Sequence, residues 1–144
     1  MVPKVIPDVV SGQTIRSLRP QASALEAAHL MRDHHISAVV VLDEADALVG
    51  IVTERDLVRR VLAEERSPAA VSLAEVMTPR PLVVVPDASP YEALEIMRER
   101  HIRHLPVVDG GKVVGMVSMR DLRHAIAVAE KERRPPGLLH RLFR

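Results

Sequence analysis

Two kinds of hydrophobic pattern run along this chain of 144 residues, and each of them occurs twice. Two stretches that begin near Ser23 and Ser89 carry apolar side chains three or four residues apart, which is the spacing of one face of an α-helix. These apolar positions are Ala27, Leu30 and Met31 in the first stretch, and Tyr91, Leu94 and Met97 in the second. Short runs rich in β-branched residues lie before and after each stretch, as is typical of strands. The pattern therefore predicts alternating strands and helices.

Each half of the chain is expected to hold a strand, a helix, two strands and a second helix, in that order. The strands are predicted at residues 14–18, 38–43 and 47–53 of the first half, and at 82–85, 104–109 and 112–118 of the second. A final helix is expected directly after Thr53 in the first half and after Ser118 in the second. The predicted fold class is α/β (α+β), with two pseudo-symmetric β-α-β-β-α repeats in which a small sheet packs on two helices.

An internal repeat supports this division. Residues 22–43 align with residues 88–109 and carry the same residue at many positions. After an adjustment of one residue in the turn, residues 48–57 align with residues 113–122. Small residues and a proline at 65–72 mark a linker. The sequence predicts a first repeat at 1–66, a second repeat at 67–130 and a basic amphipathic tail at 131–144.

The composition narrows the classes of function. Hydrophobic residues make up 47% of the chain, whereas Tyr91 and Phe143 are its only aromatic residues, which argues against a nucleic-acid surface of stacked aromatics. A formal charge of +1 is too small to gather a polyanion over the whole surface. The chain has no cysteine, which excludes disulfides and thiolate zinc sites. Because no signal peptide or membrane span is recognisable, a cytoplasmic location is expected, without nucleic acid or membrane as a partner.

A hydroxyl residue followed three positions later by aspartate occurs twice, as Thr53 with Asp56 and as Ser118 with Asp121. One interpretation is a helix N-cap, in which the hydroxyl accepts a hydrogen bond from a backbone amide and the carboxylate completes a capping box. The other interpretation is a ligand site. The free amides at a helix start attract phosphate, and a nearby carboxylate can hold the hydroxyls of a ribose. With apolar strands beside it as a slot for a flat base, such a site describes an adenosine-nucleotide cleft.

The chain resembles a pair of cystathionine-β-synthase-type (CBS) domains, the Bateman module, and in particular the small stand-alone bacterial pairs. The resemblance rests on VMTP at 76–79, HLPVVD at 104–109, and the Gly-x-x-Thr/Ser-x-x-Asp stretches at 50–56 and 115–121. It covers residues 6–130. It implies two pseudo-two-fold-related halves, a homodimer that forms a disc of four repeats, and binding of an adenine nucleotide.

The resemblance also implies roles for individual residues. Asp56 and Asp121 would bind ribose. The phosphate would contact Thr53, Arg55, Ser118, Arg120, Arg103 and His104, and adenine would lie near Thr78, Pro79 and Pro106. The first half has VSGQ where the second has VMTP, and SAVV where the second has RHLP. The cleft that contains Asp121 is therefore expected to be the working one, with Thr78 and Pro79 beside it.

The function that the resemblance implies is regulatory. An adenine nucleotide would shift the conformation of the module, and an unknown downstream protein would respond to the shift. AMP, ADP and ATP are the expected ligands, with NAD and S-adenosylmethionine ranked behind them, and the phosphate count, the occupancy of each cleft and any role of Mg²⁺ stay open. No cofactor is required and no enzyme activity is expected, because the chain has no nucleophile elbow, P-loop or dinucleotide fingerprint. The alternative is a ligand-independent dimerising scaffold whose two motifs are only helix caps.

Two other features of the sequence are its histidine clusters and its C-terminal tail. The histidines at 34–35, 101 and 104 form two short clusters. They are expected to be solvated or to end helices rather than to bind metal, with His104 as a phosphate contact the exception. The tail has Leu138, Leu139, Leu142 and Phe143 among basic residues and is expected to fold onto its own dimer, with a membrane surface or a partner protein as the alternative.

Overall fold

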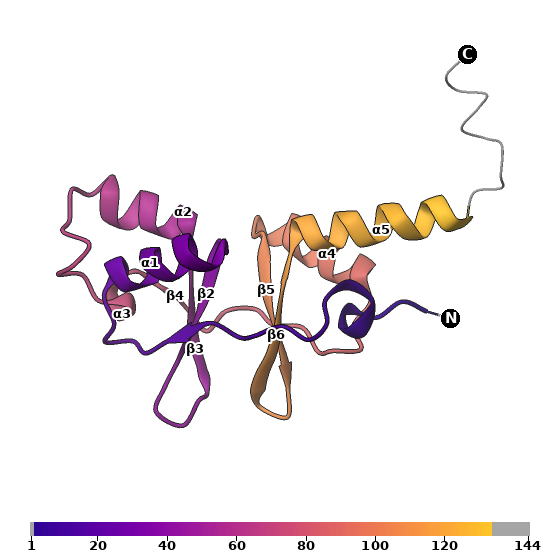
Figure 1. Ribbon diagram of the computed structural model, residues 1–144, viewed down its shortest axis with the longest axis horizontal. Coiled ribbons are helices and arrows are strands. Elements are labelled where there is room, and N and C mark those ends of the chain that lie inside the picture. Colours follow the sequence, from indigo (N-terminus) through magenta and orange to yellow (C-terminus); the bar gives the residue numbers. More distant parts are fainter. Residues whose placement is uncertain (1, 134–144) are drawn as a thin grey trace, which may run out of the picture.

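The computed structural model describes residues 2–133, which form two halves that lie side by side (Figure 1). Each half consists of a strand hairpin with helices packed against it. This confirms the predicted fold class of two small mixed α/β repeats. The predicted tail begins inside the last helix, and its residues from 134 onward lie outside the described residues.

The first half contains a sheet and three helical segments. Its elements are β1 (Ser17–Leu18), α1 (Ala24–His34), β2 (Ala38–Leu42), β3 (Leu48–Thr53), α2 (Glu54–Leu57) and the π-helical turn η2 (Val58–Leu62), which continues α2. Strand β1 runs parallel to β2, and β2 and β3 form an antiparallel hairpin. A fourth strand, β4 (Thr78–Pro79), comes from the far side of the linker and pairs antiparallel with β3.

The second half contains the hairpin of β5 (His104–Asp109) and β6 (Lys112–Ser118), with α4 (Pro90–Arg100) and α5 (Met119–Arg133) packed against it. The predicted strand at 82–85 is wrong as a full strand, because a single parallel bridge joins Val84 to Val107. The prolines at 81 and 86 have no amide to donate on either side of it. In the first half the predicted strand at 14–18 is reduced to Ser17–Leu18.

Local sequence signals set the limits of α1 and α4. Ser23 caps α1 with its side chain, and Glu26 completes the capping box. Ser89 caps α4 by accepting a hydrogen bond from the Tyr91 amide at 3.2 Å, and proline occupies the first helical position. Both helices end at a histidine in the left-handed region, His35 with φ 52° and His101 with φ 54°. The prediction that these histidines end equivalent helices is confirmed.

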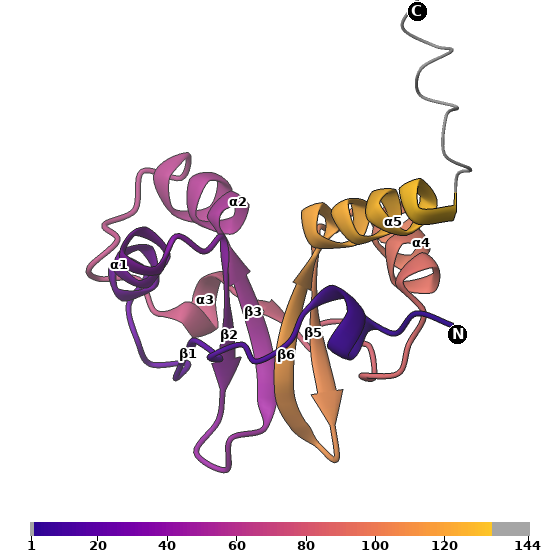
Figure 2. The ribbon, with the colours of Figure 1, turned by 45° about the vertical axis from the view of Figure 1, so that its right-hand side comes forward.

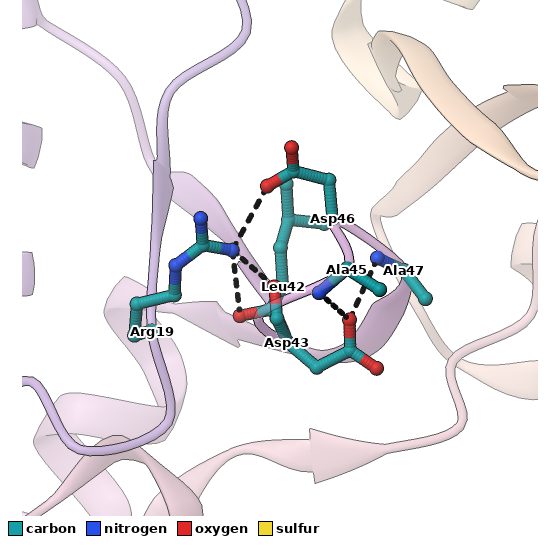
Figure 3. Close-up of polar contacts among 6 residues, drawn as sticks. All are labelled: Arg19, Leu42, Asp43, Ala45, Asp46 and Ala47. Carbon is teal, nitrogen blue, oxygen red and sulfur yellow. Dashed lines mark hydrogen bonds and ion pairs between the residues drawn. The ribbon is translucent and has the colours of Figure 1, made fainter.

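The turn between β2 and β3 is closed by side chains (Figure 3). The Asp43 carboxylate accepts hydrogen bonds from the backbone amides of Ala45 and Ala47, at 2.9 and 3.0 Å. Arg19 contacts the other side of the turn, where its guanidinium donates to the carbonyl of Asp43 and pairs with the Asp46 carboxylate at 2.9 Å. Asp43 therefore closes the turn by accepting from amides two and four residues on, a role that aspartate commonly has in turns.

The segments that precede each sequence repeat are exchanged between the halves. The helical turn η1 (Val5–Val9) lies against α5 of the second half (Figure 2). Val5 and Val10 are buried in the core of that half. Reciprocally, α3 (Leu73–Val76) carries Leu73 into the core of the first half. Backbone hydrogen bonds fix both exchanges, from Val5 to Ala88 at 2.9 Å and from Leu73 to Ala22 at 2.8 Å. The boundary between the two packed halves therefore differs from the predicted boundary between the repeats at 66/67. The repeat boundary stays a prediction.

Candidate functional site

A cleft of about 1060 Å³ lies between the two halves. The starts of α2 and α5 contribute to its walls, together with β4 and the segment after it and the C-terminal end of α4. Eight of the eleven residues predicted for the ligand line it. They are Thr53, Arg55, Asp56, Thr78, Arg103, His104, Ser118 and Arg120. Residues that lie 67 positions apart in the sequence, such as Ser37 and His104, therefore meet in one site.

Thr53 and Asp56 form a complete capping box at the start of α2. The Asp56 amide donates to Oγ1 of Thr53 at 3.2 Å, and the Thr53 amide donates to Oδ2 of Asp56 at 2.9 Å. The cap interpretation of the motif is confirmed at this position. The box does not use Oδ1 of Asp56, whose charged neighbour is the Arg60 guanidinium at 3.9 Å. Because Asp56 lines the cleft and 15% of its side chain is exposed, Oδ1 can still accept a hydrogen bond from a ligand.

Ser118 and Asp121 form the same box at the start of α5. The two hydrogen bonds are both 3.0 Å long, from the Asp121 amide to the Ser118 hydroxyl and from the Ser118 amide to Oδ2 of Asp121. The surroundings differ, however. Ser118 and Arg120 line the cleft, whereas Asp121 is not part of its wall. The two aspartates are thus equivalent as caps but unequal in their access to the cleft.

The expectation that Thr78 and Pro79 accompany Asp121 is wrong. Strand β4 pairs with β3, so that Thr78 lies opposite Ile51 and Pro79 lies opposite Gly50. Since β3 leads directly into Thr53, the T-P pair belongs with Asp56. The cause is the exchange of segments, which carries residues 71–79 into the first half.

The remaining two predicted residues, Pro79 and Pro106, do not line the cleft. Pro79 is exposed on β4, and Pro106 is buried in β5 opposite Met116. Their predicted contact with adenine stays a prediction.

Arginine gives the cleft its charge. Six arginines line it, namely Arg55, Arg80, Arg100, Arg103, Arg120 and Arg123, against the two acids Glu54 and Asp56. Among residues 2–133, none of these six arginines takes part in an ion pair. The cleft therefore has a large local excess of positive charge although the whole chain is nearly neutral.

Sequence reasoning missed Arg80, Arg100 and Arg123. Arg80 follows the T-P pair directly, which was a usable signal. Arg123 lies three residues after Arg120, on the same face of α5, and this spacing was also available. Arg100 reaches the cleft only because α4 ends there, and no local pattern indicates that.

His104 joins the halves across the cleft. Its Nε2 lies 2.8 Å from the hydroxyl of Ser37, the residue that precedes β2. Burial lowers the pKa of His104 below its ordinary value and outweighs the opposing effect of the carboxylates of Asp121 and Glu54. The ring is therefore neutral at neutral pH and can offer a ligand a hydrogen bond but not a full charge. Ser37 is a further residue of the site that sequence reasoning missed.

Two further observations concern metal ions and membranes. The described part of the chain has no group of three or more histidine, aspartate or glutamate side chains placed to hold a metal ion. None of the helices within residues 2–133 is long and apolar enough to cross a membrane.

The chain is similar in sequence to known proteins. The family model described as "CBS domain" matches residues 5–63 and 73–128. An uncharacterized protein of Methanopyrus kandleri is 36% identical over 130 residues, and the mitochondrial CBS domain-containing protein CBSX3 of Arabidopsis thaliana is 32% identical over 111 residues. These matches span 87% and 74% of this chain, but only 63% and 54% of the length of the two relatives.

Three solved structures illustrate the likeness in fold. A CBS-domain protein from Burkholderia ambifaria has a TM-score of 0.81 at 35% identity, and the alignment covers 88% of this chain and 95% of the other. A CBS domain protein from Pyrobaculum aerophilum, solved in complex with AMP, has a TM-score of 0.75 at 25% identity, with 86% and 97% covered. A hexameric CBS-CP12 protein from bloom-forming cyanobacteria has a TM-score of 0.80 at 26% identity, with 92% and 76% covered.

Proposed function

Because the chain belongs to the CBS domain family, whose paired domains are regulatory, we propose that it binds an adenine nucleotide in the cleft between its halves and passes on the binding as a conformational change. No bond is made or broken in this function. The chain would act on a downstream protein rather than as an enzyme, and it would need no resident cofactor.

One arrangement carries the proposal. Two carboxylates, four hydroxyls and six arginines that form no ion pair among the described residues line the same cleft. Oδ1 of Asp56 is suited to accept from a ribose hydroxyl. Thr53 ends β3, and Thr78 lies on the neighbouring strand β4, opposite Ile51. The arginines suit phosphate oxygens, to which a guanidinium can donate two parallel hydrogen bonds. The AMP bound to the Pyrobaculum protein supports a nucleotide as the ligand.

The charge of the cleft favours ligands with several phosphates. One AMP phosphate carries at most two negative charges, which is few for a wall with six arginines and two acids. We therefore rank ATP and ADP before AMP, and NAD and S-adenosylmethionine behind all three. Arg103, Arg120 and Ser118 lie on the second half and Arg55 on the first, so one chain of phosphates would contact both halves.

The conformational response would come from the junction of the two halves. His104 and Ser37 join the halves by a single hydrogen bond, and the phosphate-binding groups lie around it. A ligand changes the angle between the halves only if it binds two arrangements with unequal affinity. Phosphates that draw arginines from both halves together satisfy this condition.

A homodimer is part of the proposal. Several large apolar side chains of the helices and of η2 are exposed on the single chain, and Leu62 with 71% and Val58 with 55% are the most exposed of those on the first half. Leu25 on α1 and Tyr91 on α4 occupy equivalent positions of the two repeats. A second copy that covers these faces would remove them from water. The hexameric cyanobacterial neighbour supports assembly in this family.

The second candidate is the ligand-independent dimerising scaffold, and the two capping boxes favour it. Both boxes are complete without a ligand, so Thr53 and Ser118 already have a structural role. This candidate explains the motifs but not the six arginines that line the cleft without ion-pair partners.

A thermal-shift panel on the purified protein tests the proposal. ATP, ADP, AMP and GTP are added at equal concentration, and tripolyphosphate serves as the control for charge alone. A ligand present at a hundred times its Kd raises the free energy of unfolding by about 2.7 kcal/mol, which is easily seen as a higher Tm. The proposal predicts larger shifts with ATP and ADP than with GTP or tripolyphosphate. No shift with any adenine nucleotide would leave the scaffold as the better account.

A further inference from the structure

Gln13 holds the outer edge of β6 through its side chain. Its Nε2 donates to the carbonyl oxygen of Met116, and its Oε1 accepts from the Met116 amide, both at 2.9 Å. A Cβ added to the neighbouring Gly115 would lie 3.0 Å from Oε1 of Gln13. The side-chain amide therefore lies flat against the strand and takes up both backbone hydrogen-bonding groups of Met116.

The equivalent edge in the first half is held by a strand. In the alignment of the repeats, residues 10–13 correspond to 76–79, and Met116 corresponds to Ile51. Ile51 pairs with Thr78 of β4, and Thr78 also lines the cleft. In the second half the Gln13 side chain thus forms the hydrogen bonds to the strand edge that the backbone of β4 forms in the first half.

This replacement changes what the second half can offer a ligand. The residue that corresponds to Thr78 is Gly12, which has no side chain and a φ of +62°. Gly12, Gln13 and Met116 do not line the cleft, and neither does Asp121. The start of α5 therefore has its capping serine and aspartate, but no threonine beside them and no strand paired with the Gln13 side of β6.

From this comparison we infer that Gln13 determines the number of nucleotide sites, because it seals the edge of β6 in place of a T-P strand and so confines binding to the Asp56 half. The inference rests on the proposed function and adds to it the stoichiometry of one nucleotide per chain. It also reverses the expectation from the sequence motifs, which favoured the half with Asp121.

Calorimetric titration with ATP tests the inference on the full chain. The wild type is compared with Asp56→Asn and Asp121→Asn, a matched pair in which the amide oxygen can still accept the capping hydrogen bond. A fourth protein carries Gly12→Thr and Gln13→Pro, which introduce a T-P pair at the positions equivalent to Thr78 and Pro79. Its fold is checked by thermal unfolding.

The expected result is about one ATP per chain for the wild type and for Asp121→Asn, and a severe loss of binding for Asp56→Asn. The double variant is expected to gain a second site, which Asp121→Asn then removes. Two sites in the wild type, one of them lost with Asp121→Asn, would overturn the inference while leaving the proposed function intact. The same holds if a folded double variant gains no site. If the double variant does not fold, the ATP stoichiometry of Asp56→Asn and Asp121→Asn still tests which half binds the nucleotide. No binding of ATP to any of the proteins would overturn both.

Discussion

Replacing Ser37 by alanine removes the hydrogen bond that joins the two halves at the cleft. The bond is 2.8 Å long and its partner His104 is partly buried, so water replaces the lost hydroxyl only in part. A hydrogen bond of this kind contributes about 1 kcal/mol, and a partner left partly unsatisfied adds to the loss, so we expect about 1–2 kcal/mol. For a chain of this size the loss corresponds to a decrease in Tm of roughly 3–6 °C.

Thermal and urea unfolding at pH 7.5 measure this loss. Ser67→Ala is the matched control, because Ser67 is exposed and its side chain makes no hydrogen bond to the described residues. If Ser37→Ala unfolds at the same temperature and urea concentration as Ser67→Ala, then the hydrogen bond to His104 does not stabilise the junction, and the reasoning about the cleft is refuted.

The same histidine gives a dependence on pH. The unfolded imidazole has a pKa of about 6.5, and burial lowers the pKa in the folded state. Between the two values the unfolded chain binds more protons, so the stability from this group is complete above about pH 7 and is lost as the pH falls through the folded pKa. His104→Gln is expected to weaken this dependence, which unfolding curves from pH 5 to pH 8 would measure. An unchanged profile would mean that His104 keeps its ordinary pKa.

Three further predictions concern stability. Thr53→Ala is expected to lower the free energy of unfolding by about 1 kcal/mol in urea titrations, because the amide of Asp56 loses its cap, and an unchanged midpoint would contradict the box. Gly50→Ala is expected to cost about 1–3 kcal/mol, since the added Cβ would lie 2.3 Å from Sδ of Met77, and a neutral effect would show that Met77 can move away freely. Leu105→Ala removes a fully buried side chain of the second core and is expected to cost about 2–5 kcal/mol in the same assay; a cost below 1 kcal/mol would contradict its burial.

The parts of the fold that depend on local sequence could be predicted. The serine caps at 23 and 89 determine where α1 and α4 begin, and both signals lie within a few residues of the helices they start. The hairpins follow from β-branched runs on either side of Asp- and Gly-containing turns. Because the two halves align, an element predicted in one half was supported by the equivalent segment of the other.

The composition of the site could be predicted only in part, because it depends on which half buries which segment. Val10 and Val76 occupy equivalent positions and both are buried, so the local sequence is compatible with either half. The structure places them in opposite cores, and this moves Thr78 next to Asp56 instead of Asp121. An exchange of this kind is decided by long-range packing. The hydrogen bond between Ser37 and His104, which spans 67 positions, was beyond prediction for the same reason.

The arginine-rich wall shows a further limit of sequence reasoning. Arg55, Arg103 and Arg120 were recognised because they stand next to motif residues. Arg100 was missed because its place depends on where a helix ends in space rather than on its neighbours in the chain. The net charge of +1 did not indicate this cluster, because acidic residues elsewhere in the chain balance the positive charge of the arginines.

The central claim is that the cleft binds an adenine nucleotide through Asp56. The affinity of Asp56→Asn for ATP, measured by calorimetry beside the wild type and Asp121→Asn, tests it most directly. Loss of a charged acceptor costs about 1.5–3 kcal/mol, so we expect Kd to rise about tenfold to a hundredfold for Asp56→Asn and to change by less than about threefold for Asp121→Asn. Equal affinities for all three proteins, or a loss confined to Asp121→Asn, would contradict the account.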